Sequence, residues 1–215
     1  MASSGVAICA DDYIVSGVSQ PFDAVLLIAF GGPQGPDDIR PFLGNVLRGR
    51  RVSPDRVEEV AHHYELFGGV SPLTALTARQ AAGLQRTLAE RGVPLKVYVG
   101  MRNWHPYLTD TLAAMSRDGV RRAIAFVAAA HRSYSGCLQY KENVVEARNG
   151  LLRAGLADVG VTYVGDWHLH EGFIAANAEH VREALARLSD VARDHVENST
   201  RGGRRARPRR AQQVF

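Results

Sequence analysis

Cysteines are scarce in this sequence, and long apolar runs are missing from it. The 215 residues include two cysteines, Cys9 and Cys137, which provide no disulfide framework and fit a reducing compartment. No apolar run approaches the roughly 20 residues that a membrane-spanning helix needs. The N-terminal stretch has no basic region, and Asp11 and Asp12 interrupt its apolar patch, so we expect no signal peptide. We therefore predict a cytoplasmic protein without a transmembrane segment.

A complete nucleotide-binding glycine motif is also missing. The segment LLIAFGGPQGPDDI, residues 26–39, leads from an apolar run through glycines to a helix start. In a G-x-G-x-x-G turn, Gly32 and Gly35 would be the later glycines, but Phe30 replaces the first. Pro33 removes a backbone N–H, and the aspartates that follow would repel a phosphate. No Gly-Lys-Ser/Thr follows, so we expect neither a dinucleotide nor a P-loop nucleotide here.

Basic charge is concentrated at one end of the chain. The isoelectric point is about 9.3, yet residues 201–215 alone contain six arginines and no acidic residue. The first 200 residues carry 20 basic and 22 acidic side chains, so the body is slightly acidic. An arginine-rich end can bind nucleic acid or form a disordered tail. Since no aromatic residues alternate with the arginines, we favour a disordered tail and no specific nucleic-acid partner.

Four short apolar runs have the length of buried strands. They lie at residues 23–30, 94–101, 121–130 and 159–167. Helical patterns separate them, and one begins at Ser53 and Pro54, which suit the N-cap and first position of a helix. Strands that alternate with helices predict an α/β fold with a mostly parallel sheet covered by helices. In such a sheet, ligands bind beyond the carboxyl ends of the strands.

Apolar residues at helical spacing predict two further helices later in the chain. The first apolar face comprises Cys137, Tyr140, Val144, Ala147 and Leu151. The second comprises Ile174, Ala178, Val181, Leu185 and Leu188. Gly92 and Gly119 are expected to end two earlier helices, because glycine is the residue that commonly follows a helix C-terminus.

Aromatic and histidine side chains are frequent just after the predicted strands. The residues there include Phe30, Arg102, Asn103, Trp104, His105, His131, Tyr134, Ser135, Trp167, His168 and His170. This composition suits a large, flat, apolar ligand with polar edges better than a phosphate. His168 and His170 have a spacing that could ligate a metal from a strand, but no third ligand accompanies them, so we predict no metal site.

Four separate segments resemble ferrochelatases, most closely the coproporphyrin type of Gram-positive actinobacteria. They read LLIAFGGPQGPDDIRPFLGNVLRGRRV, HHYELFGGVSPLTALTARQA, VYVGMRNWHPYLTDTLAAM and SYSGCLQYKENV. The resemblance covers residues 22–190 and implies one of the two similar, Rossmann-like halves of a chelatase fold. It implies that the family's enzymes bind a tetrapyrrole in the cleft between the halves. They insert ferrous iron into a porphyrin, coproporphyrin III or protoporphyrin IX, during haem biosynthesis.

The resemblance also implies a set of substrate-binding residues. They are Phe30, His63, Tyr64, Ser71 and Tyr140. Phe30 replaces a tyrosine that approaches the iron in some members, and a phenyl ring can only pack or stack. His63 replaces the arginine of an Arg-Tyr pair that faces propionates, which weakens this contact near neutral pH. From the residues alone, Tyr64 and Tyr140 equally fit the cores of their helices, and Ser71 could simply cap a helix.

Two other positions depart from the resembled pattern. Leu47 stands where some members have a further propionate-binding arginine, although Arg48 and Arg50 lie alongside. Some members hold an iron–sulfur cluster, to which Cys137 could contribute, but the other cysteines needed for one are absent. We therefore expect no cofactor, with porphyrin and ferrous iron as substrates.

The end of the chain departs most from the family. The S/T-A-H-S motif and the later glutamate that take part in metal insertion have no counterpart after residue 190, so no catalytic residue is assigned. We expect a mobile extension at 1–21, a chelatase-like domain at 22–190 and a basic tail at 191–215. The first hypothesis is a ferrochelatase truncated or shifted out of frame, and inactive alone. The alternatives are a non-catalytic tetrapyrrole-binding module, in which a homodimer replaces the missing half, and a nucleic-acid-binding protein.

Overall fold

The computed structural model describes residues 22–131 and 133–187, apart from the side chain of Cys137. The predicted extension at 1–21, the basic tail at 191–215 and the expected domain end at 190 lie outside the described residues. The chain divides into two compact units after Asp166. The first unit contains the sheet and most of the helices, and the second contains a single described helix.

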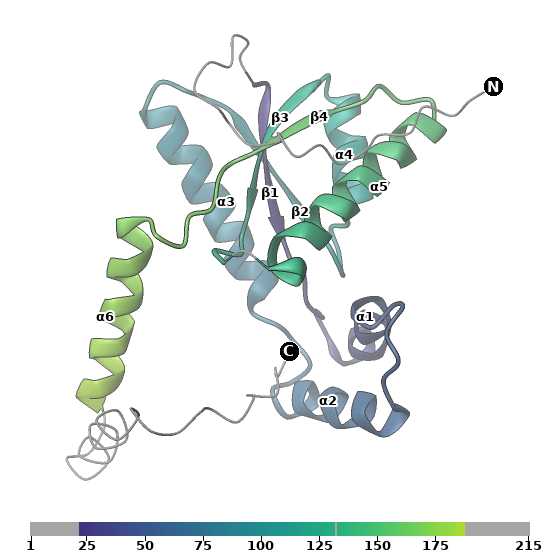
Figure 1. Cartoon of the computed structure of the whole chain (residues 1–215), viewed down its shortest axis with the longest axis vertical. Helices are drawn as coiled ribbons and strands as arrows, with labels where there is room; N and C mark the ends of the chain where they lie inside the picture. The colour runs from purple at the N-terminus through teal and green to yellow at the C-terminus, as the bar shows by residue number, and fades with distance from the viewer. Residues whose placement is uncertain (1–21, 132, 188–215) are drawn as a thin grey trace. The chain divides into compact units, whose positions relative to one another are not determined.

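A four-stranded parallel sheet forms the centre of the first unit (Figure 1). Its strands are β1 (Ala24–Ala29), β2 (Lys96–Met101), β3 (Arg122–Val127) and β4 (Gly160–Tyr163). The spatial order is β2-β1-β3-β4, so the entirely buried β1 lies between β2 and β3. Ala29 is level with Met101, and Ile28 with Val127, so three strands end at the same edge. The structure confirms all four predicted strands and the α/β fold.

Helices cover both faces of this sheet. Figure 1 shows α3 (Leu73–Glu90) on one face and α4 (Leu108–Arg117) with α5 (Gln139–Arg153) on the other. The main core joins the second face to these two helices. Its larger members are Leu26, Ile28, Leu112, Met115, Tyr140, Val144 and Leu151. The predicted apolar face of α5 is thus buried, while Cys137 lies in the π-helical turn Tyr134–Leu138 just before it.

A smaller core forms where the chain leaves β1. Here α1 (Ile39–Val46) follows a short turn, Pro36–Asp38, and packs against α2 (Pro54–Leu66). The buried residues of this core are Ile39, Phe42, Leu43 and Ala61. The predicted N-cap is confirmed, since the Ser53 Oγ accepts a hydrogen bond of 3.4 Å from the backbone N–H of Arg56.

Helix α6 (Glu171–Arg187) is the described helix of the second unit. Within this unit its predicted apolar face is exposed, since Ile174 is 51 % exposed, Val181 58 % and Leu185 37 %. An amphipathic pattern predicts the helix but not the surface that covers it. None of the described helices has the length and apolar content to cross a lipid bilayer.

Candidate functional site

The glycine turn after β1 is packed against two other segments of the chain. Gly31 has φ +87°, and a Cβ there would lie 2.9 Å from the backbone nitrogen of Trp104. A Cβ on Gly32 would lie 2.4 Å from the Cβ of Ser71. The Ser71 N–H donates a hydrogen bond of 2.8 Å to the carbonyl oxygen of Pro33. These glycines therefore permit close packing between chain segments, which is a structural reason for the partial glycine motif.

The carboxylate of Asp38 orients an aromatic side chain beside this turn. Its Oδ2 accepts a hydrogen bond of 3.1 Å from the indole Nε1 of Trp104 and one of 2.9 Å from the backbone N–H of Gln34. The aspartate therefore belongs to the local packing of the turn. Trp104 is held with its ring against α1.

Four aromatic rings form a cluster at the carboxyl edge of the sheet, with Phe42 at its centre. The ring centroid of Phe42 lies 6.1 Å from that of Phe30, 5.9 Å from Tyr64 and 6.4 Å from Trp104, each in an edge-to-face arrangement. Such pairs stabilise a cluster beyond their burial. Phe30 and Tyr64, both half-buried, are thus brought together from segments more than thirty residues apart. Burial raises the pKa of the Tyr64 phenol, which favours its neutral, hydrogen-bond-donating form.

The other two residues expected at the substrate edge differ in their environment. His63 is exposed on α2. Ser71 is half-buried, and its Oγ accepts a hydrogen bond of 3.3 Å from the backbone N–H of Leu73 at the start of α3. The structure thus gives Ser71 the helix-start contact that its sequence context suggested. Its hydroxyl hydrogen can still be donated to a ligand.

Tyr140 is 5 % exposed and belongs to the main core. Burial raises the pKa of its phenol to about 12. The guanidinium of Arg102 lies 5.7 Å from the Tyr140 ring and 6.0 Å from the Phe30 ring. Burial lowers the pKa of this guanidinium. Arg102 therefore connects two of the residues expected at the site, through cation–π contacts with both.

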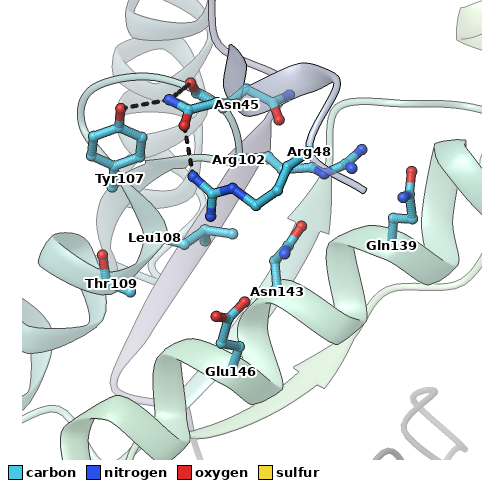
Figure 2. Close-up of a pocket in the computed structure, with 10 residues that line it drawn as sticks. Asn45, Arg48, Arg102, Tyr107, Leu108, Thr109, Gln139, Asn143 and Glu146 are labelled. Atoms are coloured by element: carbon cyan, nitrogen blue, oxygen red, sulfur yellow. Dashed lines mark hydrogen bonds between the residues drawn. The ribbon is translucent and has the colours of Figure 1, made fainter. Parts of the chain in front are cut away.

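A polar pocket of about 440 Å³ lies between α1, α5 and the segment that follows β2 (Figure 2). Its lining residues are Asn45, Arg48, Arg102, Asn103, Tyr107, Leu108, Thr109, Gln139, Asn143 and Glu146. Asn103 is buried, and both its backbone N–H and its Nδ2 donate to the carbonyl oxygen of Phe30, at 3.0 Å and 3.1 Å. These bonds attach the segment after β2 to the end of β1.

Of the residues that line this pocket, the sequence pattern predicted Arg102 and Asn103 at the edge of the sheet, but not most of the others. Gln139, Asn143 and Glu146 follow one another at steps of four and three along α5. Residues at this spacing share one face of a helix, here a polar face beside the apolar face of α5. The spacing could therefore have predicted that these three side chains lie together.

The remaining residues of the predicted rim are distributed over both units. In the first unit His131 is exposed, and the Tyr134 hydroxyl donates a hydrogen bond of 3.3 Å to Glu142. In the second unit the Nδ1 of His170 accepts a hydrogen bond of 3.2 Å from the backbone N–H of Gly172 at the start of α6. Across residues 22–131 and 133–187, no group of three or more histidine, cysteine or acidic side chains is placed to hold a metal ion.

The fold is that of an α/β domain with a parallel sheet, and an aromatic cluster and a polar pocket lie at the carboxyl edge of that sheet. The sequence model of the ferrochelatase family matches residues 22–200. This chain belongs to the ferrochelatase family, which confirms the resemblance seen in its sequence.

Several curated relatives show the same relationship. The coproporphyrin III ferrochelatase of Streptomyces coelicolor is 45 % identical over 176 residues, which cover 82 % of this chain and 47 % of the relative. That of Nocardia farcinica is 48 % identical over 174 residues, covering 81 % and 49 %. A ferrochelatase of Rhodopirellula baltica is 46 % identical over 164 residues, covering 76 % and 46 %. The chain spans about half the length of the curated relatives it matches.

Proposed function

We propose that this chain binds coproporphyrin III and serves the insertion of ferrous iron into it during haem biosynthesis, in the cytoplasm. The observation that carries the proposal is the aromatic cluster around Phe42 at the carboxyl edge of the sheet, beside a polar pocket. A porphyrin is flat and apolar at its centre and anionic at its rim, so it needs both kinds of surface. The coproporphyrin III ferrochelatases among the relatives support this choice of substrate.

In this proposal some of the substrate-binding residues contact the porphyrin ring, and others bind its propionate carboxylates. Phe30 provides a half-buried apolar surface for the macrocycle, and without an oxygen it takes no part in iron coordination. Ser71 and Tyr64 offer hydroxyl groups to the propionate edge. His63 adds a positive charge there only when it is protonated. Tyr140 supports the site from the core, since little of its side chain is exposed.

Iron insertion also requires that two pyrrole protons leave the porphyrin, which calls for a positioned base. No described residue of the aromatic cluster or of its propionate edge is assigned to this step. This chain therefore binds and orients the porphyrin, and ferrous iron is the second substrate, which reaches the porphyrin while it is bound at the aromatic cluster.

Titration with coproporphyrin III, followed by absorbance and fluorescence, tests the proposal. We expect Phe30→Ala to weaken binding, because it removes apolar contact with the ring. Phe22→Ala is the matched control, since Phe22 precedes β1 at the opposite edge of the sheet. Equal weakening by both variants, or no binding by the unmodified chain, would refute the proposal. A different result would indicate a non-catalytic tetrapyrrole-binding module. In that case the chain binds coproporphyrin III, but no iron is inserted, either by the chain alone or by the chain assembled with a partner.

A further inference from the structure

The amino edge of the sheet lies opposite the aromatic cluster and the polar pocket, and three helix-to-strand turns meet there. They lie at residues 91–95, 118–121 and 154–159. The Nζ of Lys96 lies 2.7 Å from the Oδ2 of Asp118, which joins the first turn to the second. The Ser116 hydroxyl donates a hydrogen bond of 2.6 Å to the carbonyl oxygen of Ala157, which joins the second to the third. The three turns therefore form one surface of the first unit.

Four exposed arginines lie in these turns or next to them. We call them the amino-edge arginines, and they are Arg91, Arg117, Arg121 and Arg153. Among the residues that the structure describes, none of the four has a carboxylate oxygen within 4.0 Å, the distance that defines an ion pair. Ion pairs in this part of the chain therefore do not neutralise their charges.

Two aspartates of the same edge already have other partners. Asp118 accepts hydrogen bonds from the Nζ of Lys96 and from the Tyr98 hydroxyl, at 2.7 Å and 2.6 Å, and these bonds lower the pKa of its carboxyl group. Asp158 pairs with Arg148 at 2.7 Å. These carboxylates are therefore occupied, and the edge keeps an excess of arginine.

Arg121 is held in place by the backbone around it. Its Nη1 donates hydrogen bonds to the carbonyl oxygens of Ser116 and Val120, at 3.1 Å and 2.9 Å. Its backbone N–H donates one of 2.7 Å to the carboxylate of Asp23. A guanidinium has five N–H donors, so most of those of Arg121 stay available to a partner. An ordered donor also lowers the entropic cost of binding.

The helix dipoles balance only part of this charge. Arg117 and Arg153 lie in the last turns of α4 and α5, where the dipole amounts to about −0.5 of an elementary charge. Each guanidinium carries a full positive charge, and Arg121 lies beyond the end of α4. An excess of positive charge therefore remains for an anionic partner.

Two apolar side chains lie beside the arginines. Val93 is 47 % exposed in the turn that begins with Arg91, and Leu152 is 43 % exposed next to Arg153. Protein interfaces are enriched in arginine and depleted of lysine, and they combine charge with apolar contact. A lipid surface requires a larger apolar face, and single-stranded nucleic acid requires aromatic rings, which the described residues of the three turns lack. The composition therefore favours a protein with a carboxylate-rich surface.

We propose that the amino edge is a docking surface for an acidic protein, whose carboxylates pair with the amino-edge arginines. The guanidinium fork matches a carboxylate in geometry, so one arginine can make two parallel hydrogen bonds to it. Val93 and Leu152 supply apolar contact beside these pairs. The amino and carboxyl edges are at opposite ends of the strands, so a protein docked here leaves the aromatic cluster of the first unit uncovered. The proposal does not rest on porphyrin binding.

A double variant and a charge-matched control test the surface in the full chain. Arg117→Gln/Arg153→Gln removes two of the amino-edge arginines. Arg51→Gln/Arg79→Gln removes the same charge from the turn between α1 and α2 and from the middle of α3, where both side chains are exposed. Thermal unfolding confirms that each variant is folded. The arginines of residues 201–215 are the same in all the proteins, so their contribution cancels when dissociation constants are compared.

The probes are poly-L-glutamate, duplex DNA and phosphatidylglycerol vesicles, titrated at one low ionic strength because salt screens exposed charges. Poly-L-glutamate presents the carboxylates of an acidic protein without any phosphate. We expect the double variant to raise the Kd for poly-L-glutamate about fivefold or more, as the loss of two exposed ion pairs predicts, and the control to change it less than about twofold. An equal effect of the control, or a change below about twofold in the double variant, overturns the proposal. A larger loss of affinity for DNA or for the vesicles than for poly-L-glutamate overturns the choice of an acidic protein as the partner.

Discussion

Gly32→Ala is expected to destabilise the chain, because the position has no room for a methyl group. The new Cβ would lie 2.4 Å from the Cβ and 2.5 Å from the Oγ of Ser71. Carbon atoms in contact are normally about 3.5–4.0 Å apart. The Cβ of Ser71 cannot rotate away, so the backbone of one segment must move.

The expected magnitude follows from two effects of that movement. Overpacking of this kind costs about 1–3 kcal/mol of the free energy of unfolding. Separation of the segments also breaks the hydrogen bond of 2.8 Å from the Ser71 N–H to the Pro33 carbonyl, which contributes about 0.5–1.5 kcal/mol. We therefore expect a loss of about 2–4 kcal/mol, together with weaker porphyrin binding, since Ser71 is displaced.

Gly35→Ala in the same turn is the matched control. A Cβ at Gly35 meets no atom within 4 Å, and its φ of −173° is ordinary extended backbone. Alanine there should be neutral or stabilise by about 0.4–1 kcal/mol, because it restricts the unfolded chain. Urea unfolding of both variants gives the comparison. Free energies of unfolding that agree within about 0.5 kcal/mol would refute the steric explanation.

Three further predictions concern the site. Ser71→Ala should raise the Kd for coproporphyrin III about tenfold or more, because a hydrogen bond to a carboxylate contributes about 1.5–3 kcal/mol. The N-cap variant Ser53→Ala is the control. A Kd of Ser71→Ala within about twofold of that of the unmodified chain would exclude this role. Burial raises the pKa of Tyr140 from 10.0 to about 12, so the stability that it contributes is complete below pH 10 and is lost as the pH rises through the folded value. Urea unfolding between pH 10 and 12 should show a decline in the free energy of unfolding, and this decline should be smaller in Tyr140→Phe. An identical decline in both proteins would contradict the raised pKa of Tyr140. The chain should show little iron insertion when incubated anaerobically with ferrous iron and coproporphyrin III, because no described residue of the aromatic cluster or of its propionate edge is a positioned base, a group that typically contributes 10²–10⁴-fold to the rate. Turnover close to that of the full-length Streptomyces coelicolor relative would show that reasoning to be wrong.

The sequence by itself determined the secondary structure and the family. The four apolar runs became the strands of the sheet, because buried parallel strands need continuous apolar residues. Ser53 and Pro54 began α2, and Gly92 and Gly119 follow the ends of α3 and α4 with φ of +76° and +86°. These signals are local, since capping and backbone preference act within one turn of a helix.

The common location of the residues that follow the strands was also predictable. Parallel strands end at a common edge, so Phe30 and Arg102 were both expected at that edge. The resemblance to ferrochelatases added His63, Tyr64 and Ser71, whose roles stay predictions. Local pattern also predicted α6, but it did not predict that the apolar face of that helix would be exposed within its own unit.

Only the tertiary structure decided which side chains meet. The order β2-β1-β3-β4 brings the segment after β2 directly beside the end of β1, and this places Arg102 between Phe30 and Tyr140. The polar pocket likewise joins Asn45 of α1 to Asn143 of α5, nearly a hundred residues later. Such contacts depend on strand order, register and the angles at which helices cross the sheet. Hydrophobic periodicity records which face of each element is buried, but it contains no information about the neighbour that buries it.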